Sequence, residues 1–163
     1  MTNRRTGKQY QEFITLTQDV NRARNQQYQF CNSRSPGSFL PEPRDEGENL
    51  FLTNVVTNSF ILGMTRTEGE WIWHSDKSKV KWTKWAENAN QNDSGRNCAY
   101  MDITTVSVYG YWIDFNCGTP GLSVPLSLVC QRNPGMWEID NFFENNVNFW
   151  HFFILFKWQF SGG

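Results

Sequence analysis

Four cysteines constrain this chain more than any other feature, and none is separated from another by only two residues. They stand at Cys31, Cys98, Cys117 and Cys130. Without a Cys-x-x-Cys pair, and with only His74 and His151 as histidines, no zinc-binding spacing is recognisable. An even count in a chain rich in Asn, Ser and turn residues favours two disulfide bonds and an oxidising compartment. Three connectivities are open to four cysteines, and their order along the chain does not choose among them.

Length and charge limit the class of protein. A chain of 163 residues suits one domain with appendages, since domains commonly span roughly 100–200 residues. Fifteen Lys and Arg against sixteen Asp and Glu give a formal net charge of -1. That balance predicts no nucleic-acid partner and offers no electrostatic basis for binding an anionic membrane.

The sequence divides into three parts. We expect a disordered segment over residues 1–9, a domain over residues 10–133 and an aromatic-rich tail over residues 134–163. The first residues hold no apolar run of the kind found in signal peptides. Because this conflicts with the disulfide prediction, we expect that a preceding segment is missing or that the chain was cut from a longer one. The tail's longest apolar run, Phe149–Phe156, is too short to cross a bilayer, which needs about twenty residues. Membrane contact or oligomerisation through the tail remains open, without other support.

Periodicity predicts a mixture of short helices and strands. A helix that begins near Thr17 is expected to bury Cys31 and to end at Ser35-Pro36-Gly37, and a second helix is expected over Glu48–Val56, with Leu52 facing inward. The remaining elements are a long polar loop at Ala86–Asn97 and short strands. We expect the strands at Tyr10–Leu16, Phe60–Met64, Glu70–Trp73, Lys79–Trp82, Cys98–Met101, Gly110–Asp114 and Leu126–Cys130.

Several motifs occur in an order that resembles one family, the C-type lectin-like domains. Single motifs are weak signals, but the ordered set extends over about a hundred residues and is specific. The matching segments are Cys31 in the first helix, Pro41–Leu52 with its Glu-Asn-x-Phe-Leu, Phe60–Met64, Glu68–Trp73 as Glu-Gly-x-Trp-x-Trp, Trp82–Trp85, and Trp112–Cys117 for the family's Trp-Asn-Asp-x-x-Cys.

The resemblance implies an α+β fold of the C-type lectin type. In that fold two helices flank small antiparallel sheets, a long irregular loop binds ligand, and two disulfides brace the chain. It also implies the pairs Cys31–Cys130 and Cys98–Cys117, and an extracellular or secreted protein that binds a glycan or a protein and is not an enzyme.

Sugar-binding members of the family hold calcium with oxygen ligands that also bridge to the sugar. Their ligand set is a Glu-Pro-Asn in the long loop, a Glu two residues before a strand cysteine, and the Asn-Asp of Trp-Asn-Asp. In this sequence the corresponding positions are Asn88-Ala89-Asn90, Arg96 and Ile113-Asp114. Asn88, Asn90 and Asp114 are therefore the candidate calcium ligands, and Arg96 is a fourth candidate for ligand contact.

Two replacements argue against calcium, which leaves it only a possible cofactor. Ile113 carries no oxygen ligand, and Arg96 changes the charge of the site from about -3 in the family pattern to about zero here. We therefore expect calcium-independent binding of a protein or glycoconjugate ligand. The alternative is a calcium-dependent lectin that uses the Ala86–Asn97 loop and Asp114, with Asn92 or Asp93 as substitute ligands.

Other features of the sequence bear on the partner. In a protein-binding member, exposed Tyr109, Tyr111, Arg96 and Lys84 are candidates for the rim of the interface. Members of the family also recognise mineral or ice surfaces. Asn92-Asp93-Ser94 is an N-glycosylation acceptor within the loop. Adjacent residues in His74-Ser75-Asp76 cannot face one another as nucleophile, base and orienting group must, so we predict no enzyme.

Overall fold

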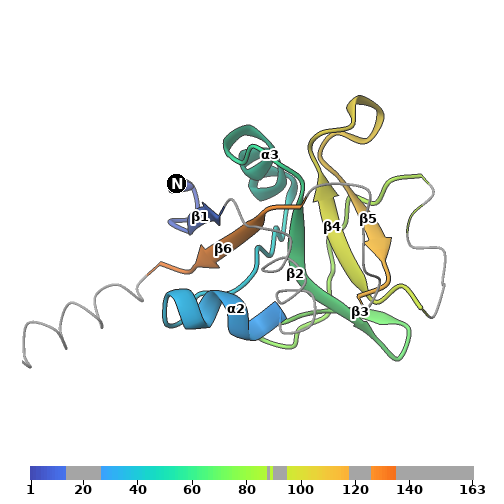
Figure 1. The fold of residues 1–163 in the computed structure, drawn as a ribbon, viewed down its shortest axis with the longest axis horizontal. Helices are drawn as coiled ribbons and strands as arrows, with labels where there is room; N and C mark the ends of the chain where they lie inside the picture. The colour runs from blue at the N-terminus through green and yellow to red at the C-terminus, as the bar shows by residue number, and fades with distance from the viewer. Residues whose placement is uncertain (14–26, 88, 90–94, 118–125, 135–163) are drawn as a thin grey trace, which may run out of the picture. The chain divides into compact units, whose positions relative to one another are not determined.

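The structure, a computed structural model, describes residues 1–13, 27–87, 89, 95–117 and 126–134 (Figure 1). Residues Met1–Arg132 form one compact unit. Its described elements are β1 (Gln9–Phe13), α2 (Gln27–Arg34), α3 (Glu46–Val55), β2 (Phe60–Thr67), β3 (Glu70–Trp73), β4 (Cys98–Asp102), the 3-10 turn η1 (Val106–Val108), β5 (Tyr111–Phe115) and β6 (Leu128–Arg132).

Two antiparallel sheets organise the unit. In the smaller sheet β1 pairs with β6, so residues near the two ends of the unit lie side by side. The larger sheet has the order β3-β2-β4-β5. In its centre β2 and β4 run antiparallel, with Phe60 opposite Met101 and Thr65 opposite Cys98. This register puts the β2–β3 turn and the β4–β5 connection at opposite ends of the larger sheet, as Figure 1 shows.

The helices form where the sequence indicates. The Asp45 carboxylate accepts a hydrogen bond from the Glu48 backbone N–H at 2.9 Å and caps α3. This cap starts the helix two residues before the predicted Glu48, and Leu52 is fully buried as expected. The predicted first helix is described from Gln27 and ends at Arg34, before the Pro-Gly turn.

One predicted strand is wrong. Residues 79–82 form no strand, and Lys79 makes only an isolated bridge to Ile72. Instead β3 pairs with β2 across a tight turn at Glu68 and Gly69, both of which have positive φ (52° and 85°). A two-residue turn favours left-handed backbone conformations, which explains why the chain reverses at Glu68-Gly69.

Residues 1–9 also differ from the expected disorder. Thr2 bridges to Gln9, and Asn3 is buried. The Lys8 ammonium pairs at 2.6 Å with the buried Glu48 carboxylate, which attaches this segment to α3. The sequence gives no signal for the contact with α3 because Lys8 and Glu48 are forty positions apart.

Tryptophans dominate the core beside the larger sheet. Trp112 is fully buried and its ring contacts three others edge-to-face, with centroids 5.4–6.1 Å apart. The three are Trp73, Trp82 and Trp85. Such aromatic pairs contribute about 0.5–1.5 kcal/mol each beyond the area they bury. This packing fixes Trp85, and therefore the start of the polar loop, against the sheet.

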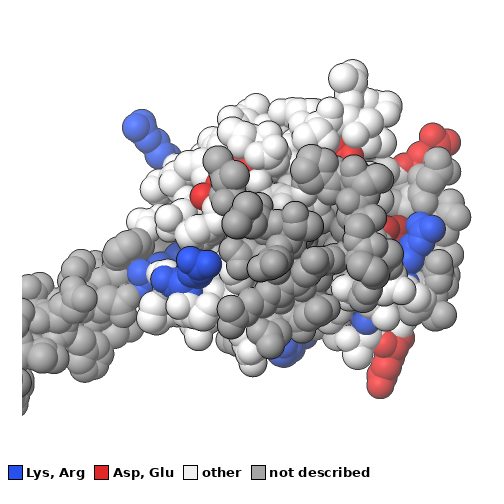
Figure 2. Space-filling model, viewed as in Figure 1, with Lys and Arg blue, Asp and Glu red and all other residues white. Residues whose placement is uncertain are grey.

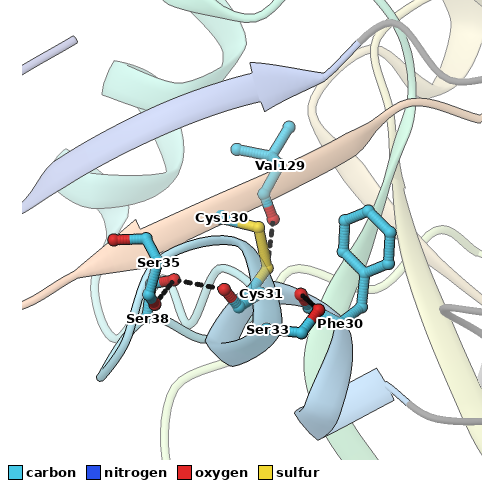
Figure 3. The surroundings of a disulfide bond; sticks show 7 residues. All are labelled: Phe30, Cys31, Ser33, Ser35, Ser38, Val129 and Cys130. Atoms are coloured by element: carbon cyan, nitrogen blue, oxygen red, sulfur yellow. Dashed lines mark hydrogen bonds between the residues drawn. A yellow bond between two sulfur atoms is a disulfide. The ribbon is translucent and has the colours of Figure 1, made fainter.

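Both disulfides implied by the resemblance are present. Cys31–Cys130 joins α2 to β6 across 99 residues, and Cys98–Cys117 closes a loop of 19. In the chain-entropy treatment these loops are worth about 4.7 and about 3 kcal/mol. Around the first bridge the Ser38 hydroxyl donates to the Cys31 carbonyl at 2.8 Å, which holds the end of α2 (Figure 3).

The C-terminal tail lies outside the described residues from position 135 onward. Within the part of the chain that the structure describes, no helix has both the length and the apolar character needed to cross a membrane.

Candidate functional site

The predicted site residues fall at one end of the polar loop and on β5. Asn88 and Asn90 lie outside the described residues, as do Asn92 and Asp93. Arg96 and Asp114 are described, and they come together: a guanidinium nitrogen lies 3.8 Å from the Asp114 carboxylate. The two residues are brought together because β4 pairs with β5, which places Asp114 opposite Ala99.

The negative charge of Asp114 is balanced by the positive charge of Arg96. The Asp114 side chain is fully buried, whereas the Arg96 side chain is about half exposed (46%). A buried carboxylate requires a counter-charge or hydrogen bonds, and here a cation supplies the counter-charge. At the position where the resemblance expects an acidic ligand, the structure therefore has a positive group beside the remaining carboxylate.

The side chains of Ile113 and Asp114 lie in different surroundings. Neighbouring residues of a strand point to opposite faces, and on β5 Ile113 lines a cavity while Asp114 is buried beside Arg96. The cavity has a volume of about 500 Å³. Its lining residues are Ala86, Glu87, Ala89, Ser107, Val108, Tyr111 and Ile113.

One wall of the cavity is the start of the polar loop, which is fastened to β5 by backbone hydrogen bonds. The Trp112 N–H donates to the Lys84 carbonyl at 2.7 Å, and the Ala86 N–H donates to the Trp112 carbonyl at 2.9 Å. The Ala89 N–H then closes a turn onto the Ala86 carbonyl at 3.0 Å. Glu87 lies between Ala86 and Ala89, the two residues that this hydrogen bond joins.

The opposite wall is the β4–β5 connection, which is organised by Asp102. Its carboxylate accepts hydrogen bonds from the backbone N–H groups of Thr104 and Thr105, both at 2.9 Å, and from their hydroxyls. Burial alone would raise the pKa of Asp102, but these bonds favour the anion and hold the pKa below its usual range. The Tyr109 hydroxyl donates to the Thr53 carbonyl at 2.7 Å and ties the connection to α3.

Two exposed tyrosines stand beside the cavity. Tyr109 is 49% exposed and Tyr111 is 40% exposed, so both rings are accessible. The Lys84 ammonium lies 5.3 Å from the centroid of the Tyr111 ring and pairs with Glu46 at 2.7 Å. In Figure 2 the tip of the β4–β5 connection projects at the upper right and carries no charged residue.

No arrangement for hydrolysis occurs at His74-Ser75-Asp76. The Ser75 hydroxyl donates to the buried Glu42 carboxylate at 2.6 Å, and Asp76 pairs with Arg44 at 2.8 Å. Burial lowers the pKa of His74 to about 4, and the nearby Lys77 charge adds to the shift. Ser75 and Asp76 hold a turn, because the polar groups of both side chains bond to structural partners.

Among the described residues, no group of three or more His, Cys, Asp or Glu side chains could hold a metal ion. At the two described positions of the expected calcium set that differ from the family pattern, neither Arg96 nor Ile113 has a side-chain oxygen.

A family model of the lectin C-type domain matches residues 20–132. The chain belongs to the C-type lectin family. A perlucin-like protein from Mytilus galloprovincialis is 27% identical to this C-type lectin-like chain over 92 residues, which are 51% of the chain and 56% of that protein. The chain thus matches little more than half the length of this relative.

Solved structures share the fold. The mouse scavenger receptor C-type lectin carbohydrate-recognition domain is 24% identical with a TM-score of 0.54, over 77% of this chain and 88% of that one. The C-type lectin CEL-I from Cucumaria echinata is 22% identical with a TM-score of 0.54, over 76% and 89%. A calcium-independent type II antifreeze protein is 20% identical with a TM-score of 0.54, over 68% and 78%.

The fold, the disulfides and the family predicted from the ordered motifs are confirmed. Domains of this family bind carbohydrate or protein ligands, are generally not enzymes and are typically extracellular or secreted. Sequence reasoning missed Glu87, Ser107 and Val108 as cavity residues. No local signal could have found them, because the cavity forms only when the loop and the β4–β5 connection meet across β5.

Proposed function

We propose that this domain recognises a protein or glycoconjugate ligand outside the cell without calcium, and that the protein ligand is the main one. The observation that supports it is the Arg96 guanidinium 3.8 Å from the buried Asp114 carboxylate. The only carboxylate of the expected calcium set already has a cation beside it.

Electrostatics disfavours a second cation at that place. At an effective dielectric of about 20, a unit charge roughly 5 Å from a divalent ion costs on the order of several kcal/mol before solvent screening. The exposure of Arg96 reduces this cost, but the site also lacks the oxygen that Ile113 would have to supply. Calcium binding therefore loses both charge and ligands.

The exposed tyrosines support a protein ligand. Tyr and Arg are enriched at protein interfaces because they combine a large contact area with hydrogen-bonding groups. Tyr109, Tyr111 and Arg96 are all exposed. The cavity between the polar loop and the β4–β5 connection would accept a side chain of the ligand.

Thermal melting of the full oxidised chain in millimolar calcium and in chelator tests this proposal. A ligand that binds only the native state raises the melting midpoint by mass action, by an amount equivalent to about 2.7 kcal/mol at a hundred times its dissociation constant. We expect no change. A calcium-dependent rise would overturn the proposal and favour the alternative, a calcium-dependent carbohydrate-binding lectin.

A paired variant makes the test sharper. Arg96→Glu combined with Ile113→Asn restores the family's ligand types at two positions and is expected to produce a calcium-dependent rise in the midpoint. Arg4→Glu makes the same charge change at an exposed residue of the N-terminal segment and is the control. An equal response of both variants would show that net charge, and not the site, governs calcium binding.

A further inference from the structure

Among the lining residues that the structure describes, Glu87 is the only charged one. Its side chain is exposed, and within the described part of the chain no ion pair or hydrogen bond engages its carboxylate. Two other described carboxylates have cationic partners: Glu46 pairs with Lys84 at 2.7 Å, and Asp114 lies beside Arg96. The cavity thus presents one negative charge without a counter-charge.

The other described lining residues are aliphatic or aromatic, apart from Ser107, which adds a hydroxyl. Ala86, Ala89, Val108 and Ile113 contribute aliphatic surface, and Tyr111 contributes an aromatic ring. That ring already receives one cation, the Lys84 ammonium at 5.3 Å from its centroid. Because Glu46 pairs with that ammonium at 2.7 Å, the Lys84 charge is balanced, and the Glu87 carboxylate, not the ring, is the group that would attract a ligand cation.

A lysine side chain matches both the apolar surface of the cavity and its carboxylate. It carries a long aliphatic stem that packs on apolar surface and a terminal ammonium that seeks a carboxylate. A cavity of about 500 Å³ lies within the usual range of ligand sites, roughly 300–1,000 Å³. It has room for such a side chain together with part of the backbone that bears it.

We propose that this cavity binds a lysine side chain of the protein ligand, with the ammonium at Glu87 and the stem against Val108 and Ile113. The inference rests on the proposed protein-binding function and adds the chemistry of the recognised residue. The described part of the loop wall is joined to β5 by backbone hydrogen bonds, and the Asp102 carboxylate holds the β4–β5 connection, which limits the ordering that those parts require when the ligand binds.

Titration of the isotope-labelled full chain with Nα-acetyl-lysine amide, followed by backbone amide NMR in chelator, tests the proposal. We expect millimolar binding that shifts the amides of Ala86, Glu87, Ala89 and Val108. Nα-acetyl-norleucine amide has a similar aliphatic stem without the ammonium, and we expect it to bind about threefold to fivefold more weakly, as for a partly exposed ion pair.

Two matched variants test whether the Glu87 carboxylate binds the ligand's ammonium. Glu87→Gln keeps the size of the side chain and is expected to remove the preference for lysine over norleucine. Glu68→Gln changes an exposed carboxylate in the β2–β3 turn, at the other end of the larger sheet, and is expected to keep the preference. Equal binding of both amides to the unmodified chain, or no shifts at the cavity, would overturn the inference.

The calcium-independent function and the lysine preference are tested by separate experiments, so either can be refuted alone. Calcium dependence is measured by melting without any amide, whereas the lysine titration is done in chelator. A rise in the melting midpoint with calcium would refute the calcium-independent function and leave the lysine preference to be judged by its own titration.

Discussion

Asn49 allows a quantitative test of how α3 holds the end of the larger sheet where β5 begins. Its side chain is fully buried and bonds to two groups of the β5 region. Its amide nitrogen donates to the Gly110 carbonyl at 2.9 Å, and its oxygen accepts from the Trp112 indole N–H at 2.8 Å. Asn49→Ala removes both partners and leaves a buried acceptor and a buried donor unpaired.

The expected loss follows from those two groups. Each buried polar group left unpaired costs about 1–3 kcal/mol, so we expect the free energy of unfolding to fall by about 4 kcal/mol. Urea unfolding of the full oxidised chain, followed by tryptophan fluorescence, measures it. Asn54→Ala, at an exposed position of the same helix, is the control and should change stability by no more than about 0.5 kcal/mol. A difference between the two variants below about 1 kcal/mol would refute the reasoning.

Two further predictions concern stability. Because burial lowers the pKa of His74 to about 4, the unfolded chain binds more protons between pH 4 and the usual histidine value of about 6.5. The contribution of His74 to the free energy of unfolding should therefore be constant above about pH 6.5 and fall by about 3 kcal/mol toward pH 4. His74→Phe should flatten this pH dependence in urea titrations. An unchanged slope would contradict the attribution to His74. Gly63→Ala should cost about 3 kcal/mol, because a Cβ would lie 2.5 Å from the Leu40 carbonyl. Gly69→Ala, with φ +85° and no atom within 4 Å, should cost only about 1 kcal/mol in the same assay, and the reverse order would refute the steric argument.

Local patterns were sufficient where local physics decides. The sequence predicted a helix at α3 with Leu52 inward, although the Asp45 cap starts it two residues before the predicted Glu48. The continuous apolar run at β2 marks a strand buried in the sheet. The predicted strand at residues 79–82 failed because alternation describes a possible strand but not its partner. In the structure β2 pairs with β4 on one side and with β3 on the other, and β3 forms an edge of the larger sheet.

For the candidate site too, some features could be predicted from the sequence and others depend on the tertiary structure. From its residue types the sequence by itself determined that the expected calcium position has lost charge, since Arg96 and Ile113 replace oxygen ligands. The resemblance to the family, not the spacing, chose the disulfide pairs. Only the tertiary structure decided that Arg96 lies beside Asp114 and that Glu87 shares a cavity with Val108 and Tyr111. The reason is physical: charge and hydrogen-bonding capacity belong to each residue, whereas distances between side chains exist only after β5 has paired with β4 and with the start of the loop.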